Sequence, residues 1–193
     1  MRLAEVERGD TLLHRLLIAT ISRASGMRLP DAARVAFYRK DFAGPSIGAW
    51  MQRTMRGPSG WSVSERELMA ALVATWNSCP FCINAHSAVA VRGMDKDAVE
   101  SALMDYRAAP IPDKLKAALV FMEKMTRTPD DLTPNDARAA FTAGLSRNDL
   151  QDAAAVAGLF AIVTRYANAL DFDIPTPDNF DTAAGRLLRR GYA

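Results

Sequence analysis

Apolar and polar residues along the chain follow the period of an α-helix in almost every stretch long enough to judge. One helix face, for example, collects Leu115, Ala118, Leu119 and Met122. Strand signals are nearly absent, because no run of Val, Ile, Tyr or Thr alternates cleanly over five residues. The pattern therefore predicts an all-α, multi-helix bundle.

Helix-start and helix-stop residues divide this pattern into seven or more helices. The expected segments are 11–25, 31–40, 64–76, 80–92, 96–105, a helix that opens at Pro112, 134–144, 147–170 and 178–190. The clearest start is a capping-box pattern, Ser64 followed three residues later by Glu67. The stretch 44–60 contains Pro45 and Pro58 and is expected to hold at most a short helix.

Size and charge limit the classes of function. The 193 residues fit one domain, and 49% apolar residues suffice for a packed core. A net charge of +2 lacks the basic excess of nucleic-acid binding proteins. No run reaches the roughly 18 apolar residues of a membrane span, and acidic residues precede the apolar stretch 16–21, unlike a signal peptide. We expect a cytoplasmic protein that binds neither nucleic acid nor membrane.

The chain has two cysteines, Cys79 and Cys82, only two residues apart. A reducing compartment argues against a structural disulfide, so the spacing needs another explanation. A CxxC pair can close a disulfide with little backbone motion, and Pro80 suits the first position of a helix. Unpaired N–H groups and the helix dipole stabilise a thiolate at that point, and the thiolate is the reactive form. The pair is therefore predicted to be redox-active.

His86 and Glu67 are the candidate partners of these thiols. His86 lies four residues after Cys82, which places the two on one helix face about 6 Å apart. Cys79 lies about 10 Å from His86 along the helix axis. The nearby base favours Cys82 as the nucleophile and Cys79 as the resolving thiol, although the helix dipole alone would favour Cys79.

Glu67 can reach His86 if the two helices fold back at residues 77–78. By helical rise Glu67 lies about 13 Å from that turn and His86 about 10 Å, so they could meet across the hairpin. Small side chains below Glu67 would let the helices approach closely; they are Ala70, Ala71, Ala74 and Ser78. The predicted relay has Glu67 orient and polarise His86, which takes the proton of Cys82. Two plainer interpretations stay open: Glu67 as only a capping residue, and His86 as only a half-buried polar residue.

The segment SERELMAALVATWNSCPFCINAHS, residues 64–87, resembles the signature of the alkylhydroperoxidase D-like, or carboxymuconolactone decarboxylase, superfamily. It resembles most the peroxidase-related branch, over about residues 36–125. The later segment GLFAIVTRYANALDF is similar to the long C-terminal helix of that branch. The whole chain, 1–193, is accordingly expected to form a single all-α domain, with a core at about 36–125 and helices in 146–190 packing on it.

The resemblance implies a homo-oligomer, a trimer or a hexamer, that reduces hydroperoxides or the disulfide of a partner such as a peroxiredoxin. It implies a lipoyl-bearing protein or another thiol as reductant and requires no cofactor or metal. By position, Glu67 and His86 fall on the proton relay, Cys82 on the attacking thiol and Cys79 on its disulfide partner. Phe81 stands where the best-known redox member carries a further histidine, which puts lipoyl use and a high peroxidase rate in doubt.

Other interpretations remain open at this level. CPFC also resembles a glutaredoxin active site, which needs a strand before the motif. Cys79, Cys82 and His86, with Glu67 or His14, could supply zinc ligands. A decarboxylase or small-molecule-binding member of the same superfamily would leave the thiols incidental, and a non-catalytic redox sensor would use them without turnover.

Overall fold

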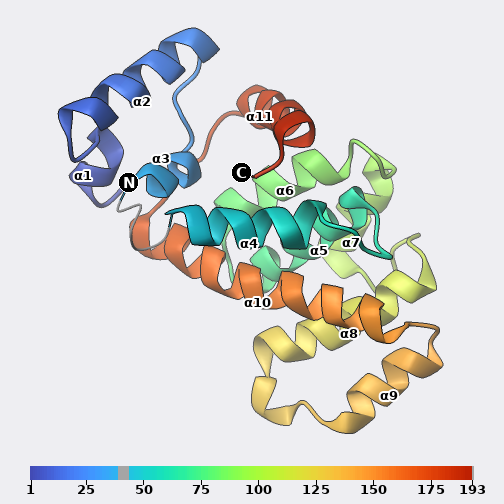
Figure 1. Cartoon of the computed structure of the whole chain (residues 1–193). Helices are drawn as coiled ribbons and strands as arrows, with labels where there is room; N and C mark the ends of the chain where they lie inside the picture. The colour runs from blue at the N-terminus through green and yellow to red at the C-terminus, as the bar shows by residue number, and fades with distance from the viewer. Residues whose placement is uncertain (39–43, 193) are drawn as a thin grey trace.

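The computed structural model describes residues 1–38 and 44–192, and Figure 1 shows its arrangement. The described part is all-α, without a strand. Its helices are α1 (Ala4–Arg8), α2 (Leu12–Ser25), α3 (Asp31–Phe37), α4 (Gly44–Arg56), α5 (Val63–Trp76), α6 (Pro80–Ala90), α7 (Lys96–Asp105), α8 (Asp113–Arg127), a 3₁₀ turn (Pro129–Asp131), α9 (Pro134–Thr142), α10 (Arg147–Leu170) and α11 (Pro177–Arg190). The predicted all-α bundle is confirmed.

Helix α5 is the centre of the bundle. Every residue from Arg66 to Ala74 is buried, so the helix is enclosed on all sides rather than on one stripe. It packs against α4, α6, α7, α8 and α10, most extensively against α6. A side chain on α5 is therefore held by the whole fold.

Helix α10 packs against α5 and α8, and in Figure 1 it crosses the bundle below α4. By length and composition alone it could span a membrane. In this structure, however, Val156, Leu159 and Phe160 are fully enclosed in the core that α5 and α8 share. That is the packing of the core helix of a bundle.

The two ends of the chain meet on one side of the bundle. The buried carboxylate of Asp31 accepts a hydrogen bond from the backbone N–H of Asp173 (2.7 Å), in the connection between α10 and α11. Arg28 bridges the same two residues, at 2.7 Å from Asp31 and 3.4 Å from Asp173. Helix α3 is thereby tied to the chain that enters α11, and α11 packs along α6. Helices α1 and α2 project from this junction (Figure 1).

Most predicted helix limits are confirmed within a few residues. Asp95 and Ser146 cap α7 and α10, and Pro80 occupies the first turn of α6 as expected. The prediction for residues 44–60 was wrong, because α4 has 13 residues. Pro45 falls in its first turn, where a proline costs no helical hydrogen bond. Helix α1 was not predicted, and part of the helix expected at 31–40 lies outside the described residues.

Candidate active site

The turn between α5 and α6 positions the two cysteines. Ser78 adopts a left-handed conformation (φ 51°), which reverses the chain between the helices. Asn168 of α10 donates its side-chain N–H to the carbonyl oxygens of Asn77 (3.0 Å) and Ser78 (3.3 Å), and Asn77 donates to Thr164 (3.1 Å). Cys79 is the N-cap of α6, directly after this turn. Helix α10 therefore fixes the position from which α6 and its thiols start.

Glu67 and His86 meet across the α5–α6 hairpin. Oε2 of Glu67 lies 2.6 Å from Nδ1 of His86, and both side chains are buried. The predicted close approach of the two helices is found, with Ala70, Ala71 and Ala74 fully buried at the α5 core. The contact between Glu67 and His86 that the relay requires is present, and its catalytic role remains a prediction.

The capping box of α5 is shifted by two residues from the predicted position. Ser62, in extended backbone, accepts from the N–H of Glu65 (3.2 Å), and Glu65 accepts from the N–H of Ser62 (2.8 Å). Ser64 and Glu67 lie within the helix, where no cap is needed. The interpretation of Glu67 as a capping residue was wrong, so its carboxylate is buried for another reason.

Two residues not predicted from the sequence complete the surroundings of Glu67. The Arg56 guanidinium at the end of α4 lies 2.7 Å from Oε1 of Glu67. The Tyr192 hydroxyl, after α11, donates to the same oxygen at 2.9 Å and lies 3.4 Å from Nδ1 of His86. The Arg56 guanidinium also stacks over the Tyr192 ring, 4.7 Å from its centroid. One carboxylate thus receives three donors from three separate segments of the chain.

These donors keep Glu67 ionised in a buried place. Burial alone would raise the pKa of the Glu67 carboxyl. The hydrogen bond and charge of His86, together with the Arg56 guanidinium, outweigh burial and hold that pKa below its usual value. An ionised carboxylate only accepts, so Nδ1 of His86 must carry the shared hydrogen. When His86 is neutral, Nε2 carries the lone pair and can act as a base.

The partners of Glu67 are themselves constrained. Burial, followed by the negative charge of Glu67, raises the pKa of Tyr192 well above its usual value, so its hydroxyl stays neutral and donates. Nε and Nη2 of Arg56 are buried without a hydrogen-bond partner among the described residues. Buried donors without partners cost free energy. The ion pair with Glu67 is the interaction that compensates for burying the Arg56 guanidinium.

The two thiols are free, buried and unequal in acidity. Each cysteine is 1% exposed. The hydrogen bond donated by the Cys82 thiol, and the N–H groups of Cys82 and Phe81, outweigh burial and lower the pKa of Cys79 to about 7. Donating that hydrogen bond, together with burial, raises the pKa of Cys82. The Cys82 thiol, and after it the N–H groups at the start of α6, thus favour the thiolate on Cys79, whereas the spacing to His86 favours Cys82.

An aromatic cluster covers the thiols. Phe81 contacts Phe172 edge-on, with ring centroids 5.2 Å apart, and Phe180 at 5.8 Å. These three rings, both cysteines, Ala74 and Ala167 form one buried apolar group. Phe81, at the position of the family's further histidine, therefore packs in the thiol cover.

Glutaredoxin-like and zinc-binding interpretations find no matching arrangement. The described residues contain no strand to precede the CxxC motif. No three His, Cys, Asp or Glu side chains of the described chain gather closely enough to hold a metal ion.

No family model and no curated protein matches the sequence. Solved structures do match its fold. A peroxidase-related protein from Silicibacter sp. TM1040 is 24% identical, with 93% of each chain covered and a TM-score of 0.76. A second, described as an alkylhydroperoxidase AhpD core from Ralstonia eutropha JMP134, is also 24% identical, with 87% of each chain covered and a TM-score of 0.72.

The chain has the alkylhydroperoxidase D-like fold. The resemblance inferred from the segment around the cysteines is thus confirmed at the level of the fold. The same fold is found in the debrominase Bmp8, at 16% identity, with 92% of this chain and 94% of that chain covered and a TM-score of 0.69. A variant of Bmp8 has been solved in complex with 2,3,4-tribromopyrrole. Uncharacterized peroxidase-related proteins and a debrominase therefore share the alkylhydroperoxidase D-like fold.

Proposed function

We propose that this protein is a thiol peroxidase or disulfide oxidoreductase that works through Cys79 and Cys82. The observation that carries the proposal is the CxxC pair at the start of α6, one helical turn from a histidine held by a buried carboxylate. Cys79 has its pKa lowered to about 7, so a substantial fraction is thiolate near neutral pH. A nucleophile, a base and a group that orients the base are the parts such chemistry needs.

The reaction consumes one hydroperoxide and two thiols. A thiolate attacks the peroxide, an S–O bond forms, the O–O bond breaks, and an alcohol or water leaves after taking up a proton. The resulting sulfenic acid is attacked by the second sulfur, an S–S bond forms and water leaves. The dithiol thereby gives two electrons to the peroxide. A dithiol or lipoyl-type reductant must then reduce the Cys79–Cys82 disulfide.

Each polar residue has a part in these steps. Cys79 holds the thiolate at rest, which favours it for the first attack. Cys82 must then lose its proton, and His86, one turn further along α6, is the base that can take it. Glu67 supports the positive charge that develops on His86, and Arg56 and Tyr192 position Glu67. The opposite order, in which Cys82 attacks the peroxide, was expected from its spacing to His86. Trapping the sulfenic acid distinguishes the two orders.

Mass spectrometry of the peroxide-treated protein tests the proposal. The expected result is a loss of two hydrogens localised to the peptide that contains Cys79 and Cys82, reversed by a dithiol reagent. Cys79→Ser is the control that cannot form the disulfide. Two free thiols after excess hydroperoxide would contradict thiol chemistry and favour a decarboxylase-like or small-molecule-binding role.

Order of attack is tested by trapping the sulfenic acid. In Cys82→Ser, the resolving partner is gone, so a dimedone-type reagent should label Cys79. In Cys79→Ser, labelling of Cys82 should be slower. The reverse ranking would restore Cys82 as the attacking thiol and leave the disulfide chemistry itself intact.

A further inference from the structure

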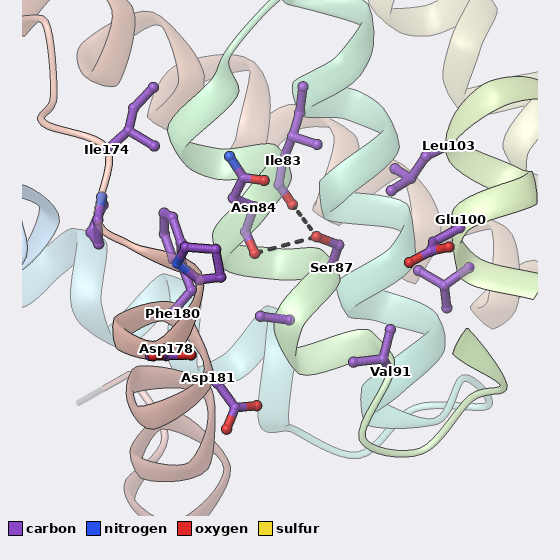
Figure 2. A pocket seen from close by; sticks show the side chains of 14 residues that line it. Ile83, Asn84, Ser87, Val91, Glu100, Leu103, Ile174, Asp178, Phe180 and Asp181 are labelled. Atoms are coloured by element: carbon purple, nitrogen blue, oxygen red, sulfur yellow. Dashed lines mark hydrogen bonds between the residues drawn. The ribbon is translucent and has the colours of Figure 1, made fainter. Parts of the chain in front are cut away.

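A groove of about 670 Å³ runs along α6, between α7 and the start of α11 (Figure 2). Its walls are apolar: Ile83 and Val91 belong to α6, Leu103 belongs to α7, and Ile174 lies in the chain that enters α11. Ile174 is 52% exposed, so the described chain does not itself fill this part of the groove. The volume lies in the range of small-molecule sites, roughly 300–1,000 Å³. The groove is therefore large enough for a small organic ligand.

The groove adjoins the apolar group that surrounds the two cysteines. Phe180 lines the groove and belongs to that group, and Ile83 and Ala88 line the groove and pack against the group. The centroid of the Phe180 ring lies 5.8 Å from that of Phe81, the residue directly before Cys82. The groove therefore borders the layer that covers the sulfurs, and Phe180 is a buried residue that both share.

The groove offers no cation to a ligand. The described residues that line it include no lysine, arginine or histidine. Two of its acidic residues are already paired, Asp181 with Arg92 and Glu100 with Lys96 at 3.6 Å. The third, Asp178, has no ion pair within the described chain. A ligand that carries a carboxylate would meet an unpaired negative charge and no free cation, so the groove favours a neutral ligand.

Two uncharged polar side chains of α6, those of Asn84 and Ser87, also line the groove. The Ser87 hydroxyl donates within its own helix, to the carbonyl oxygen of Ile83 at 2.7 Å (Figure 2). One N–H of the Asn84 amide donates to the carbonyl oxygen of Pro80 at 3.0 Å. Oδ1 of Asn84 receives no hydrogen bond from the described chain and can accept one. A neutral ligand with an O–H group therefore finds an acceptor beside the apolar walls.

We propose that this groove binds neutral, apolar organic hydroperoxides, which reach the two thiols by displacing the Phe180 ring. The inference rests on the proposed peroxidase function and names the substrate class of that site. The apolar body of the hydroperoxide packs against Ile83, Leu103 and Ile174, and its O–H group first donates to Asn84. The thiolate then breaks the O–O bond, and the alcohol takes up a proton and leaves by the same groove. Hydrogen peroxide has no apolar body and gains no binding here.

Rates of disulfide formation with two matched hydroperoxides test the charge preference. Cumene hydroperoxide and its para-carboxylate share the reacting group and differ by one negative charge. The full chain should react with cumene hydroperoxide faster, by about tenfold or more. Asn84→Lys should narrow this preference, because the new cation can pair with the carboxylate, and Asn84→Asp should widen it. Each ratio compares two substrates on one protein, so an effect of the substitution on the thiols cancels. Equal rates in the wild-type chain would overturn the proposal.

Ile174→Glu tests the apolar wall. The ratio of the rate with cumene hydroperoxide to the rate with hydrogen peroxide should fall by about tenfold or more, because a carboxylate replaces an apolar contact. Ile162→Glu on α10 is the matched control, because Ile162 is 41% exposed and does not line the groove. This control should keep the wild-type ratio. Both variants should keep the wild-type melting temperature, since both side chains are exposed.

The outcomes separate the groove from the redox function. An unchanged ratio in Ile174→Glu would overturn the role of the groove, while a disulfide formed with hydrogen peroxide would leave the redox function intact. An unchanged ratio together with slower reduction of the disulfide by dihydrolipoamide would show that the groove serves the reductant, which also overturns the proposal. A chain that forms no disulfide with any hydroperoxide would refute the peroxidase function, and this inference with it.

Discussion

The hydroxyl of Tyr192 lies 2.9 Å from Oε1 of Glu67, across a separation of 125 residues in the chain. The other oxygen of Glu67 holds His86 at 2.6 Å. Tyr192 and His86 therefore share the charge of one carboxylate. Donors to Oε1 stabilise that charge in place and leave less of it to support a positive imidazole.

Tyr192→Phe is expected to shift the pH dependence of the thiol reaction. Phenylalanine keeps the ring over Arg56 but removes the donor to Glu67, so the carboxylate supports a positive His86 more strongly. Because His86 must be neutral to take a proton, the midpoint of the pH–rate profile should move to higher pH, by less than about one unit, with a loss of about 1 kcal/mol in stability. Stopped-flow peroxide kinetics from pH 5 to 9 provides the measurement. An altered melting temperature with an unmoved midpoint would assign Tyr192 a structural role only.

Glu67→Gln should move the same midpoint to lower pH, because the imidazolium loses its partner charge, and should slow disulfide formation, the step in which His86 takes the proton of Cys82. Glutamine cannot supply the charge that supports His86, and general acid–base contributions suggest a loss of roughly 10- to 1,000-fold. Arg56 would also become a buried charge without its partner, at a cost on the order of 3 kcal/mol. His86→Ala should match the rate loss, and the double variant should add little. A wild-type rate of disulfide formation in Glu67→Gln would contradict the relay hypothesis.

Acid should weaken the wild-type protein more than Glu67→Gln. The pKa of Glu67 lies below its reference value of 4.5 in the folded protein. Its contribution to stability is therefore complete above that value and is lost as the pH falls through the lower folded pKa. Asp136, whose pKa falls to about 2 beside Lys124, adds a similar loss to both proteins. Urea unfolding from pH 7 to pH 3 should show the two stabilities converging, and a constant difference would contradict it.

Alkylation near neutral pH should modify Cys79 before Cys82. The hydrogen bond from the Cys82 thiol, followed by the N–H groups at the start of α6, lowers the pKa of Cys79 to about 7, and the same hydrogen bond, together with burial, raises that of Cys82. Peptide mapping after brief treatment with iodoacetamide gives the ratio. In Cys82→Ser, Cys79 should lose part of its acidity, although a serine hydroxyl can still donate. Faster labelling of Cys82 would mean that His86 outweighs the helix terminus.

The sequence predicted the parts of the site that depend on neighbouring helices. Glu67 and His86 lie on either side of one turn, so helical rise was enough to bring them together. Tyr192 could not be found in this way, because its position depends on how α11 packs against α6. Arg56 was missed because Pro45 and Pro58 led us to expect at most a short helix in residues 44–60. Which thiol attacks first stays a prediction, because the spacing to His86 favours Cys82 whereas the N-terminus of α6 favours Cys79.

Burial of the two sulfurs, each in a residue only 1% exposed beneath Phe81, Phe172 and Phe180, has a kinetic consequence. A reagent can react only in the fraction of time that the aromatic cover is open. The reaction rate with small hydroperoxides should therefore rise in proportion to their concentration. With bulky disulfides the rate should level off at high concentration, at the rate with which the aromatic cover opens. The same layer would filter oxidants by size and polarity before any chemistry begins, and Phe172→Ala should widen that filter.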